Sequence, residues 1–466
     1  MDIIHDAIII GGGLSGLSAA HFLQKELPAT DVVILESAER PGGAIRTYCA
    51  EGFQAEWGPH GFLDNIAASR ELLADTGLDQ EAQKAPLGDF VRYVCLKGKL
   101  AMIPQSPKKI LASSLLPFSQ KLRVLADLWK RPHLEEQSVS QWVAYRFGRG
   151  LLPFADAVFT GTYAGDFERL SIDAVLPGIR ALEKEAGSVL KGLIRKMRAA
   201  KAKKERGARK HLPAMISFPQ GMARLPERLA EDKNLVYETT VMSLSRTNSI
   251  WEVHTNRQPY KGRILILALP INRALSLLAA SPITKEKHPP FQQVPEARIA
   301  TVVMGFTDAA RIPFGFGYLA PEQEKRFALG ALFSTHMFPG RAPAGHVMLE
   351  ALVGGRRHPE KLELSDSDLV RGSYDDIRQL MHLPAPPCFT KVLRTAHGIP
   401  QLELGYPSLL AWRDGLEKEM EGLHLIGFGW GGIGINDMIT SASQVARAVA
   451  HGRLIDTRAA VKGIYF

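Results

Sequence analysis

A glycine-rich turn near the start of the chain constrains the fold more than any other feature of the sequence. The apolar run Ala7–Ile10 reads as a strand, and it is followed by the turn Gly11–Gly16 (GGGLSG) and by a helical pattern that continues to Leu27. A second apolar run, Val32–Leu35, ends at Glu36, twenty residues after the turn. This order of strand, glycine turn, helix, strand and acid is typical of a dinucleotide-binding βαβ unit.

Each part of this unit has a physical task in binding a dinucleotide. Gly11 allows a tight turn, Gly13 lets the backbone approach a pyrophosphate, and Gly16 lets the helix pack closely on the sheet. The helix N-terminus offers free N–H groups and the positive end of its dipole to the phosphates. Glu36 can accept hydrogen bonds from the adenosine ribose. We therefore expect an α/β fold that begins with a Rossmann-type domain.

The residues that follow favour FAD over NAD. The run 36–46 (ESAERPGGAIR) holds the pair Gly42-Gly43 and two arginines, Arg40 and Arg46, and a pure NAD domain has no need of that extension. A second glycine turn, Gly58–Gly61 (GPHG), can bring backbone next to a flavin ring. We interpret both arginines as cofactor contacts rather than as solvated surface charges.

A matching glycine-rich segment lies near the other end of the chain. Five glycines fall within residues 427–434, directly after the apolar run Leu423–Ile426, and a helical pattern covers Met438–Ala450. Asn436 or Asp437 is a candidate N-cap for this helix. A helix that begins against a flavin would stabilise the negative charge that reduction places on the ring, whereas the alternative is a structural βα turn.

The formal net charge of +9 is concentrated in one segment. Residues 191–210 hold ten of the 57 Lys and Arg residues and one of the 48 Asp and Glu residues, so the rest of the chain has 47 of each. A generally basic surface for nucleic acid is therefore disfavoured. Leu190, Leu193, Ile194 and Met197 share one helical face, so the segment reads either as an interfacial anchor for anionic lipids or as a solvated basic loop.

Cysteines and hydropathy exclude several classes of protein. Cys49, Cys95 and Cys388 are too few and too scattered for a disulfide framework or a zinc cluster, and we expect no metal site. Residues 1–23 lack a basic n-region, and no stretch of about 20 predominantly apolar residues would span a membrane. A cytoplasmic or inner-surface location fits best.

Between the two glycine-rich ends, three kinds of sequence alternate. Strand-like runs at 235–241, 250–254 and 263–270 look like a continuation of the cofactor domain, and prolines divide a mostly helical stretch. β-rich runs and a helix at 365–381 follow. The expected limits are residues 1–88, 213–275 and 391–466 for the FAD-binding domain, 89–100 and 276–390 for a substrate-binding domain, and 101–212 for a helical domain.

The whole chain resembles the oxygen-dependent, FAD-containing protoporphyrinogen oxidase family, within the wider amine oxidase and phytoene desaturase superfamily. The glycine motifs indicate only the superfamily, whereas Phe159–Ser171, Ile399–Tyr406 and Gly434–Ile439 are narrower. The resemblance implies a glutathione-reductase-like FAD domain, a mixed-sheet substrate domain and a helical insertion that docks on membranes. It also implies the removal of six electrons from a porphyrinogen, through FAD to oxygen, with hydrogen peroxide as product.

The resemblance further implies which residues hold the cofactor. Some of these positions match FAD contacts in the family, and the others share their glycine turns. The candidate FAD-contacting residues are Gly11, Gly12, Gly13, Leu14, Ser15, Gly16, Glu36, Ser37, Arg40, Gly43, Ala44, Arg46, Gly58, Pro59, His60, Gly61, Val241, Ile433, Gly434 and Ile435. Ala44 and His60 depart from the residues that relatives often carry. We interpret His60 as packing or hydrogen-bonding beside the flavin rather than as a general base.

Four residues are candidates for substrate contact by the same resemblance. Arg92 falls where members that oxidise protoporphyrinogen place an arginine for a propionate, and Gly161 falls where a glycine backbone lies against the macrocycle. Met304 and Leu352 align with apolar positions that sandwich a pyrrole ring. The alternatives are a surface arginine, an ordinary turn glycine and plain core residues. Because the flavin carries the chemistry, no side chain is assigned a firm catalytic role, and Gly161 is the one candidate.

The preferred reaction is the oxidation of protoporphyrinogen IX, with the four-propionate coproporphyrinogen III as the rival substrate. The presence of Arg92 favours protoporphyrinogen IX. More distant alternatives are a carotenoid desaturase, an amine oxidase, or a non-catalytic carrier that keeps the fold without flavin. The expected partners are the porphyrinogen, oxygen and an anionic membrane surface on the inner face of the cell membrane; the oligomeric state stays open, with a homodimer as one option.

Overall fold

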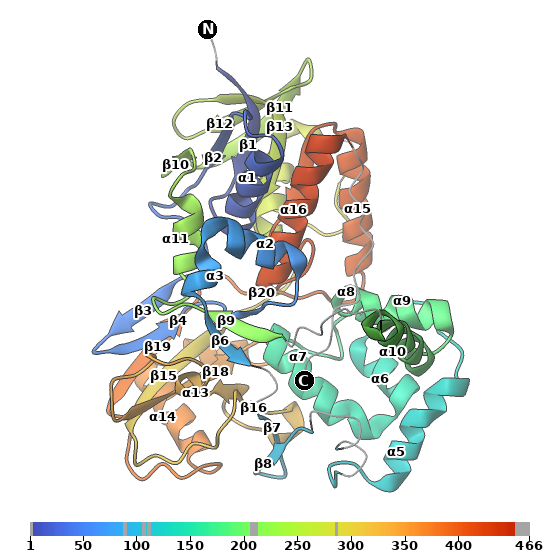
Figure 1. The fold of residues 1–466 in the computed structure, drawn as a ribbon, viewed down its shortest axis with the longest axis vertical. Helices are drawn as coiled ribbons and strands as arrows, with labels where there is room; N and C mark the ends of the chain where they lie inside the picture. The colour runs from blue at the N-terminus through green and yellow to red at the C-terminus, as the bar shows by residue number, and fades with distance from the viewer. Residues whose placement is uncertain are drawn as a thin grey trace.

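Two seven-stranded sheets and a group of helices make up the computed structural model (Figure 1). The structure describes residues 3–86, 91–104, 109, 113–205, 213–284 and 288–452. The first sheet occupies the top of the view, the second lies below it, and the helices from the middle of the sequence lie at the lower right.

The first sheet is the dinucleotide-binding one. Its strands run in the order β10-β2-β1-β13-β12-β11, with β21 also paired to β13. The strands β1, β2, β13, β21 and β10 are parallel, whereas β12 and β11 are antiparallel. The bounds are β1 Ile4–Ile10, β2 Val32–Leu35, β10 Leu235–Val236, β11 Val241–Thr247, β12 Ile250–Thr255, β13 Tyr260–Ala268 and β21 Leu423–Ile426.

Helices cover both faces of this sheet, which explains why the buried parts of its parallel strands, such as Ala7–Ile10 and Val32–Leu35, are apolar. On one face α1 (Leu14–Glu26) packs beside α16 (Ile435–His451). On the other face lie α12 (Ile271–Ala279) and α15 (Tyr406–Glu419). The first and last helices of the fold therefore form one layer, as Figure 1 shows.

The prediction of a single strand at 235–241 is wrong. The run 235–241 divides into β10 and β11, which lie at opposite edges of the sheet. The chain turns at Glu238, whose φ of 51° is left-handed, and the N–H of Thr239 donates to the carbonyl of Glu36 at 2.9 Å. An apolar composition does not reveal such a turn, because Glu238 is not a glycine.

One face of the second sheet is covered by a helix. The opposite, open face is turned towards the part of the molecule that contains the first sheet. The strand order of the second sheet is β19-β15-β18-β17-β16-β7-β8, and α14 (Asp366–Ile377) packs on the covered face. β19 belongs to this sheet, which therefore continues past residue 390, its expected end. The bounds are β7 Arg92–Leu96, β8 Lys99–Met102, β15 Ile299–Thr307, β16 Gly317–Leu319, β17 Gly330–Leu332, β18 His346–Gly354 and β19 Phe389–Arg394.

Small sheets connect these two regions. β5 and β6 both pair with β9, and the hairpin of β3 and β4 packs on the second sheet, where Phe53 stacks on Phe389 with ring centroids 4.4 Å apart. The bounds are β3 Thr47–Ala50, β4 Phe53–Glu56, β5 Phe62–Leu63, β6 Gln83–Pro86, β9 Ala214–Ser217, β14 Glu296–Ala297 and β20 Ile399–Pro400, with α2 Ala67–Thr76, α3 Leu78–Glu81, α11 Arg224–Ala230 and α13 Ser334–Met337.

Prolines lie at the start of three helices in the helical region. Pro117 is the N-cap of one helix, Pro153 is the second residue of another and Pro177 is the first residue of a third, where a missing N–H costs nothing. The elements are α5 Phe118–Leu125, η1 Ala126–Trp129, α6 Val139–Phe147, α7 Leu152–Tyr163, α8 Ile172–Val175, α9 Pro177–Ala186 and α10 Val189–Glu205. Among the helices of the described residues, none is both long and apolar enough to cross a membrane.

Candidate functional site

The first glycine turn is shaped to receive a phosphate. Gly11 has a φ of 107°, and a Cβ on it would lie 2.7 Å from the carbonyl oxygen of Ala268. A Cβ on Gly16 would lie 2.0 Å from the carbonyl oxygen of Gly11, so the helix packs on the turn only because both are glycines. A Cβ on Gly13 would meet nothing within 4 Å. The turn is therefore closed against the sheet and open at Gly13, where no side chain caps α1.

Glu36 lies over this turn. Its carboxylate accepts the N–H of Gly12 at 2.6 Å and the N–H of Ala38 at 2.8 Å, and the hydroxyl of Ser37 donates to it at 3.3 Å. The carboxylate is thus fixed at the end of β2, which is the position for the ribose of a dinucleotide. Val241 begins β11 two residues after Thr239, whose N–H donates to the Glu36 carbonyl.

The second turn continues the same surface. The N–H of Gly42 donates to the carbonyl of Gly12 at 2.9 Å, and a Cβ on Gly43 would lie 3.6 Å from the Cα of Gly13. The guanidinium of Arg40 donates to the carbonyl of Gly43 at 2.8 Å. Arg40 therefore holds the shape of the turn, and a direct contact with the cofactor stays a prediction.

Ala44 and Arg46 lead to the third turn. The guanidinium of Arg46 lies 5.8 Å from the ring centroid of Trp57. A Cβ on Gly58 would lie 2.7 Å from the carbonyl oxygen of Ala44, and one on Gly61 would lie 2.6 Å from that of Ile216. The run Gly58-Pro59-His60-Gly61 is therefore held between the second turn and β9, farther along the line that starts at Glu36.

The C-terminal glycine segment meets this line at its far end. The helix α16 begins at Ile435 with Gly434 as its N-cap, and not after Asn436 or Asp437 as expected. Asp437 instead accepts the N–H of Gly434 at 3.0 Å, and the amide nitrogen of Asn436 donates to the carbonyl of Leu63 at 2.9 Å. Ile433, Gly434 and Ile435 are thereby fastened next to the third turn.

Three of the predicted contacts in α1 and α16 have buried side chains. Leu14 and Ile435 both lie in the core between α1 and α16, and Ser15 is buried as well. Any contact that these residues make with the cofactor therefore comes from their backbone. Contacts between the glycine turns thus link Glu36 to Gly12, Gly43 to Gly13 and Gly58 to Ala44, and the open position at Gly13 suits the pyrophosphate of FAD.

One row of residues crosses the open face of the second sheet. Glu350 of β18 pairs with Leu332 of β17, Leu332 pairs with Gly317 of β16, and Gly317 pairs with Arg92 of β7. Residues opposite each other on neighbouring strands point to the same face. Glu350 and Arg92 therefore lie on one face with their Cα atoms roughly 14 Å apart, at about 4.8 Å per strand.

A second row on the same face carries two other predicted residues. Leu352 pairs with Gly330, and Gly330 pairs with Leu319. A Cβ on Gly161 of α7 would lie 2.4 Å from Cδ2 of Leu319. Arg92, Leu352 and Gly161, which are distant in sequence, therefore meet around one face of the sheet.

Met304 does not lie on the open face with Arg92 and Leu352. It pairs with Leu349, whose neighbour Glu350 points the other way, and its fully buried side chain lies in the core between the sheet and α14. The alternative role of a plain core residue fits this position. The alternation of a strand places Val303, rather than Met304, on the open face.

Arg92 is a half-buried cation. Its guanidinium lies 4.7 Å from the ring centroid of Phe316, and burial lowers its pKa. Within the ranges that the structure describes, no carboxylate pairs with it. A guanidinium in this state is suited to an anionic group supplied by a ligand.

Sequence reasoning missed a charge cluster on the open face. Glu350 accepts from Nε2 of His60 at 2.9 Å and from the hydroxyl of Ser334. Beside them Arg341 donates to Glu56 at 2.7 Å. The available signal was Glu350 itself, the single acidic residue in the otherwise apolar strand HVMLEALVG.

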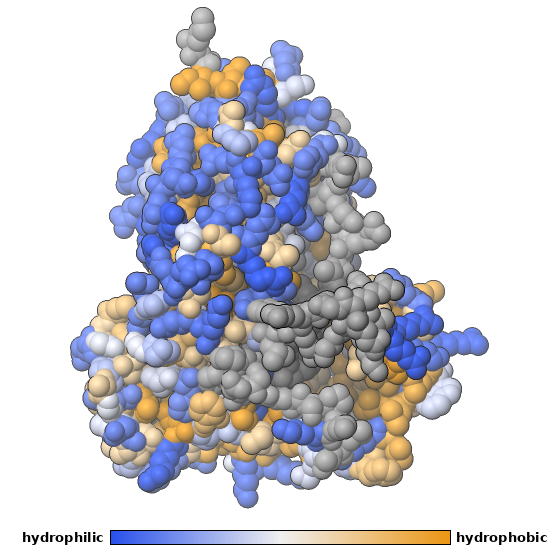
Figure 2. All heavy atoms as spheres, in the orientation of Figure 1, coloured by the Kyte–Doolittle hydropathy of each residue, from blue (hydrophilic) through white to orange (hydrophobic). Residues whose placement is uncertain are grey.

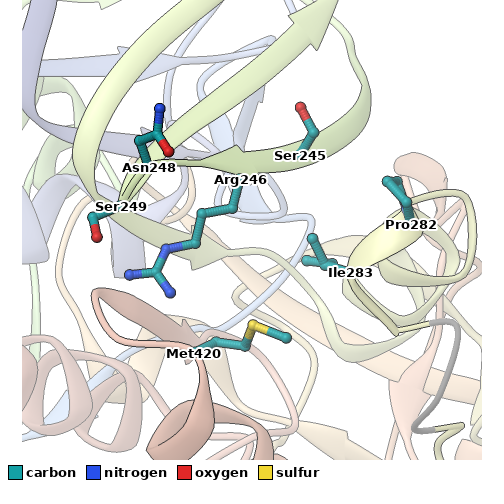
Figure 3. A pocket seen from close by; sticks show the side chains of 7 residues that line it. All are labelled: Ser245, Arg246, Asn248, Ser249, Pro282, Ile283 and Met420. Carbon is teal, nitrogen blue, oxygen red and sulfur yellow. The ribbon is translucent and has the colours of Figure 1, made fainter.

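A separate hollow lies away from this surface. Figure 3 shows it between the β11–β12 hairpin, Pro282 and Ile283, and Met420 after α15, with the side chain of Arg246 crossing it. None of the predicted site residues lines it, so we assign it no part in the chemistry.

Comparison with known proteins agrees with this geometry. A family model described as flavin containing amine oxidoreductase matches residues 14–450. Protoporphyrinogen oxidase 2, chloroplastic/mitochondrial, from Arabidopsis thaliana is 27% identical over 477 residues, covering 95% of this chain and 93% of that protein. Coproporphyrinogen III oxidase from Staphylococcus aureus (strain NCTC 8325 / PS 47) is 27% identical over 466 residues, covering 95% and 98%.

Solved structures share the fold at lower identity. A crystal structure of an Exiguobacterium sp. 255-15 protein gives a TM-score of 0.78 at 22% identity and covers 97% of this chain and 100% of that one. Reduced UDP-galactopyranose mutase gives a TM-score of 0.71 at 16% identity, covering 96% and 95%. The family match spans both glycine-rich ends and the region between them. The chain therefore belongs to the flavin-containing amine oxidoreductase family and is an FAD-dependent oxidoreductase.

Proposed function

We propose that this protein oxidises protoporphyrinogen IX to protoporphyrin IX, with FAD as the electron carrier and oxygen as the acceptor that leaves as hydrogen peroxide. The observation that carries the proposal is Arg92, a half-buried guanidinium without a carboxylate partner in the described chain, on the same sheet face as Leu352 and Gly161. The names of the relatives at 27% identity support a porphyrinogen substrate.

The residues of this chain position the substrate. Arg92 can hold a propionate through two parallel hydrogen bonds. Leu319 and Leu352 offer an apolar surface to the macrocycle, and α7 approaches this surface closely at Gly161, which packs against Leu319. FAD, when bound, accepts the electrons. The protein thus supplies orientation and exclusion of water.

Coproporphyrinogen III is the alternative substrate. It carries four propionates, so it needs more cationic partners than the two-propionate substrate does. On the open face of the second sheet, Arg92 is a cation that pairs with no carboxylate of the described residues. This favours protoporphyrinogen IX as the first substrate to test.

The test is a comparison of the two porphyrinogens under air. The purified yellow protein, supplied with FAD, is expected to form fluorescent porphyrin and peroxide from both and faster from protoporphyrinogen IX. A protein that stays inert with both after FAD is added overturns the proposal. A higher rate with coproporphyrinogen III would keep the chemistry and reverse the choice of substrate.

We also propose that the helical region docks peripherally on an anionic membrane at the inner face of the cell membrane. Residues 206–210 of the basic segment lie outside the described residues. In α10, Leu193, Ile194 and Met197 are exposed, the last by 67%, beside the exposed Lys191. This pattern suits a helix lying in a lipid interface.

A second apolar stripe supports this docking. Phe118, Leu122 and Leu125 belong to α5 and Trp129 ends η1, and all four are exposed, Trp129 by 79%. Their spacing of four, three and four residues places them on one helical face. Apolar residues gather over α5 at the lower right of Figure 2, and α10 packs against η1.

A further inference from the structure

One ion pair joins the cofactor surface to the substrate sheet. His60 belongs to the third glycine turn, and Glu350 lies in the middle of β18; Nε2 of His60 and Oε2 of Glu350 are 2.9 Å apart. Glu350 is 1% exposed, and the hydroxyl of Ser334 donates to its other oxygen. The pair is therefore the direct polar link between the turn that flanks the cofactor and the face that carries Arg92.

Two other charged groups face this pair, and they are paired with each other. Arg341, which precedes β18, donates to Glu56 of β4 at 2.7 Å and to the hydroxyl of Ser217 at 2.6 Å. Glu56 also accepts the N–H of Met222 at 3.0 Å. Glu56 and Arg341 act on the pKa of His60 in opposite directions, so Glu350 is the charged neighbour with the largest effect on that pKa.

The contact between His60 and Glu350 favours their ionised forms. Burial lowers the pKa of His60, but the charge of Glu350 and its hydrogen bond raise that pKa by more. Burial raises the pKa of Glu350, and His60 brings it below its ordinary value. An imidazolium therefore lies on the side of the cofactor turn and a carboxylate on the side of the substrate sheet.

This arrangement has a direction. The line of contacts from Gly13 through Gly43, Ala44 and Gly58 leads to His60, so the positive end lies on the cofactor side. Glu350 lies in the row that ends at Arg92, so the negative end lies on the substrate side. The pair is a fixed dipole across the space between cofactor and substrate.

We propose that the His60–Glu350 pair assists hydride transfer by its orientation, with the imidazolium favouring negative charge on the flavin and the carboxylate favouring positive charge on the substrate. When a C–H bond of the substrate breaks and its electron pair leaves with the hydrogen, the donor becomes one unit more positive and the acceptor one unit more negative. A later N–H proton passes to water. Preorganised dipoles stabilise such charge separation strongly in a water-excluded site.

Glu350 acts through His60 and is a positioning residue. Without its charge, burial would keep the imidazole neutral at pH 7. Glu350 therefore matters for flavin electrostatics even though it lies in the other sheet. The substrate half of this inference rests on the proposed function, whereas the flavin half does not.

The test measures the midpoint potential of FAD in the holoenzyme, by anaerobic reduction without any porphyrinogen. In His60→Gln at pH 7, the equilibrium between reduced and oxidised flavin is expected to shift about tenfold towards oxidised flavin. The midpoint potential should therefore fall by about 30 mV, the value for a two-electron couple. Glu350→Gln, which keeps the shape of the side chain, is expected to show a similar fall at pH 7. At acidic pH the potential should recover in Glu350→Gln, where His60 can still gain a proton, and not in His60→Gln.

Two controls separate charge from shape and position. His60→Lys keeps a cation and is expected to hold the wild-type potential. His21→Gln removes a histidine from α1 that pairs with Asp75 at 3.1 Å, and it should leave the potential unchanged. A His60→Gln enzyme with the wild-type potential, or a His60→Lys enzyme that matches His60→Gln, overturns the proposal.

The result is independent of the proposed substrate. If the potentials shift as expected and both porphyrinogens fail as substrates, the proposed reaction is wrong and the electrostatic role of His60 stands. If porphyrin forms at the wild-type rate in His60→Gln with an unchanged potential, the reaction stands and this inference fails.

Discussion

Two of the buried charge clusters in the described residues differ in what they connect. In the helical region, Arg146 pairs with Asp127 at 3.0 Å and with Glu183, and Arg180 pairs with Glu183 at 2.7 Å. In the candidate site, His60, Glu350, Arg341 and Glu56 carry the same two positive and two negative charges. The first cluster joins helices of one region, whereas the second joins the two sheets.

The difference lies in which cation can lose its proton. Arginine stays charged in proteins at any relevant pH, so the helical cluster is permanently ionised. Histidine titrates near neutrality, so the charge at the site depends on Glu350 and on pH. The comparison teaches that a buried arginine cluster fixes structure, whereas a buried histidine pair between cofactor and substrate can tune chemistry.

The largest effect is expected from breaking the helical cluster. Arg146→Met leaves the buried Asp127 without a charged partner and leaves Glu183 with Arg180 alone, and such a break costs about 3–5 kcal/mol in the free energy of unfolding. Chemical denaturation measures it. Arg371→Met removes an exposed arginine paired with Asp368 and is the matched control, with almost no change expected. A free energy of unfolding within about 1 kcal/mol of wild type for Arg146→Met would contradict the structural role.

Arg92 sharpens the comparison because it lacks the partner that the clustered arginines have. Arg92→Ala is expected to lower kcat/KM for protoporphyrinogen IX by about 30-fold, or about 2 kcal/mol, mainly through KM. Its stability should change little, because no carboxylate of the described chain is left unpaired. Arg263→Ala, at an exposed ion pair with Asp6, is the control. An unchanged KM would remove Arg92 from the substrate site.

The pH dependence of stability distinguishes the two clusters directly. The pKa of His60 is raised, so its contribution is present at low pH and is lost as the pH rises through the folded-state pKa. The pKa of Glu350 is lowered, so its contribution is lost as the pH falls through the folded-state pKa. Wild type should therefore exceed His60→Gln by roughly 2 kcal/mol near neutrality and by less at either extreme.

Denaturation midpoints across pH check this expectation. The stability difference between wild type and Arg146→Met is expected to persist at alkaline pH, because arginine keeps its charge there. A difference for His60→Gln that stays constant from acidic to alkaline pH would show that the pair does not titrate as proposed.

The smallest effect on stability is expected from exposed apolar residues on the outer surface of the helical region. Replacing Phe118 and Trp129 by serine removes exposed apolar area and should change the free energy of unfolding by about 0.5 kcal/mol or less. Binding to anionic vesicles should fall about tenfold, since the removed side chains no longer enter the interface. Sedimentation with anionic and neutral vesicles measures this. Phe314→Ser, another exposed phenylalanine outside these helices, is the control, and equal binding of all variants would contradict docking.

The cofactor half could be predicted from sequence because its requirements are conformational. Gly11 and Gly16 are needed where a Cβ would collide with backbone, and such needs are visible as residue types at fixed spacing. The resemblance to the porphyrinogen oxidase family was confirmed for the same reason, since its motifs are local. The expected start of α16 was wrong because its N-cap is Gly434, which has no side chain that could mark a cap in the sequence.

The substrate half was less predictable because it depends on register. Whether Met304 or Val303 faces the open side is decided by a one-residue alternation, and both are apolar. Glu350 meets His60 across 290 positions of sequence, and no local pattern encodes that contact. The predicted roles of Arg92, Gly161 and Leu352 stay predictions, although the strands bring all three to one face.

The layer shared by α1 and α16 has a consequence for how the protein is made. The ribosome releases the first helix roughly 400 residues before the last one, and the glycine segment at 427–434 comes just as late. The N-terminal βαβ unit must therefore wait, with one flank uncovered, until synthesis is almost complete. The predicted FAD contacts at 433–435 therefore imply that loading of the cofactor is a late step of maturation, and that nascent chains which stop before residue 435 retain it poorly.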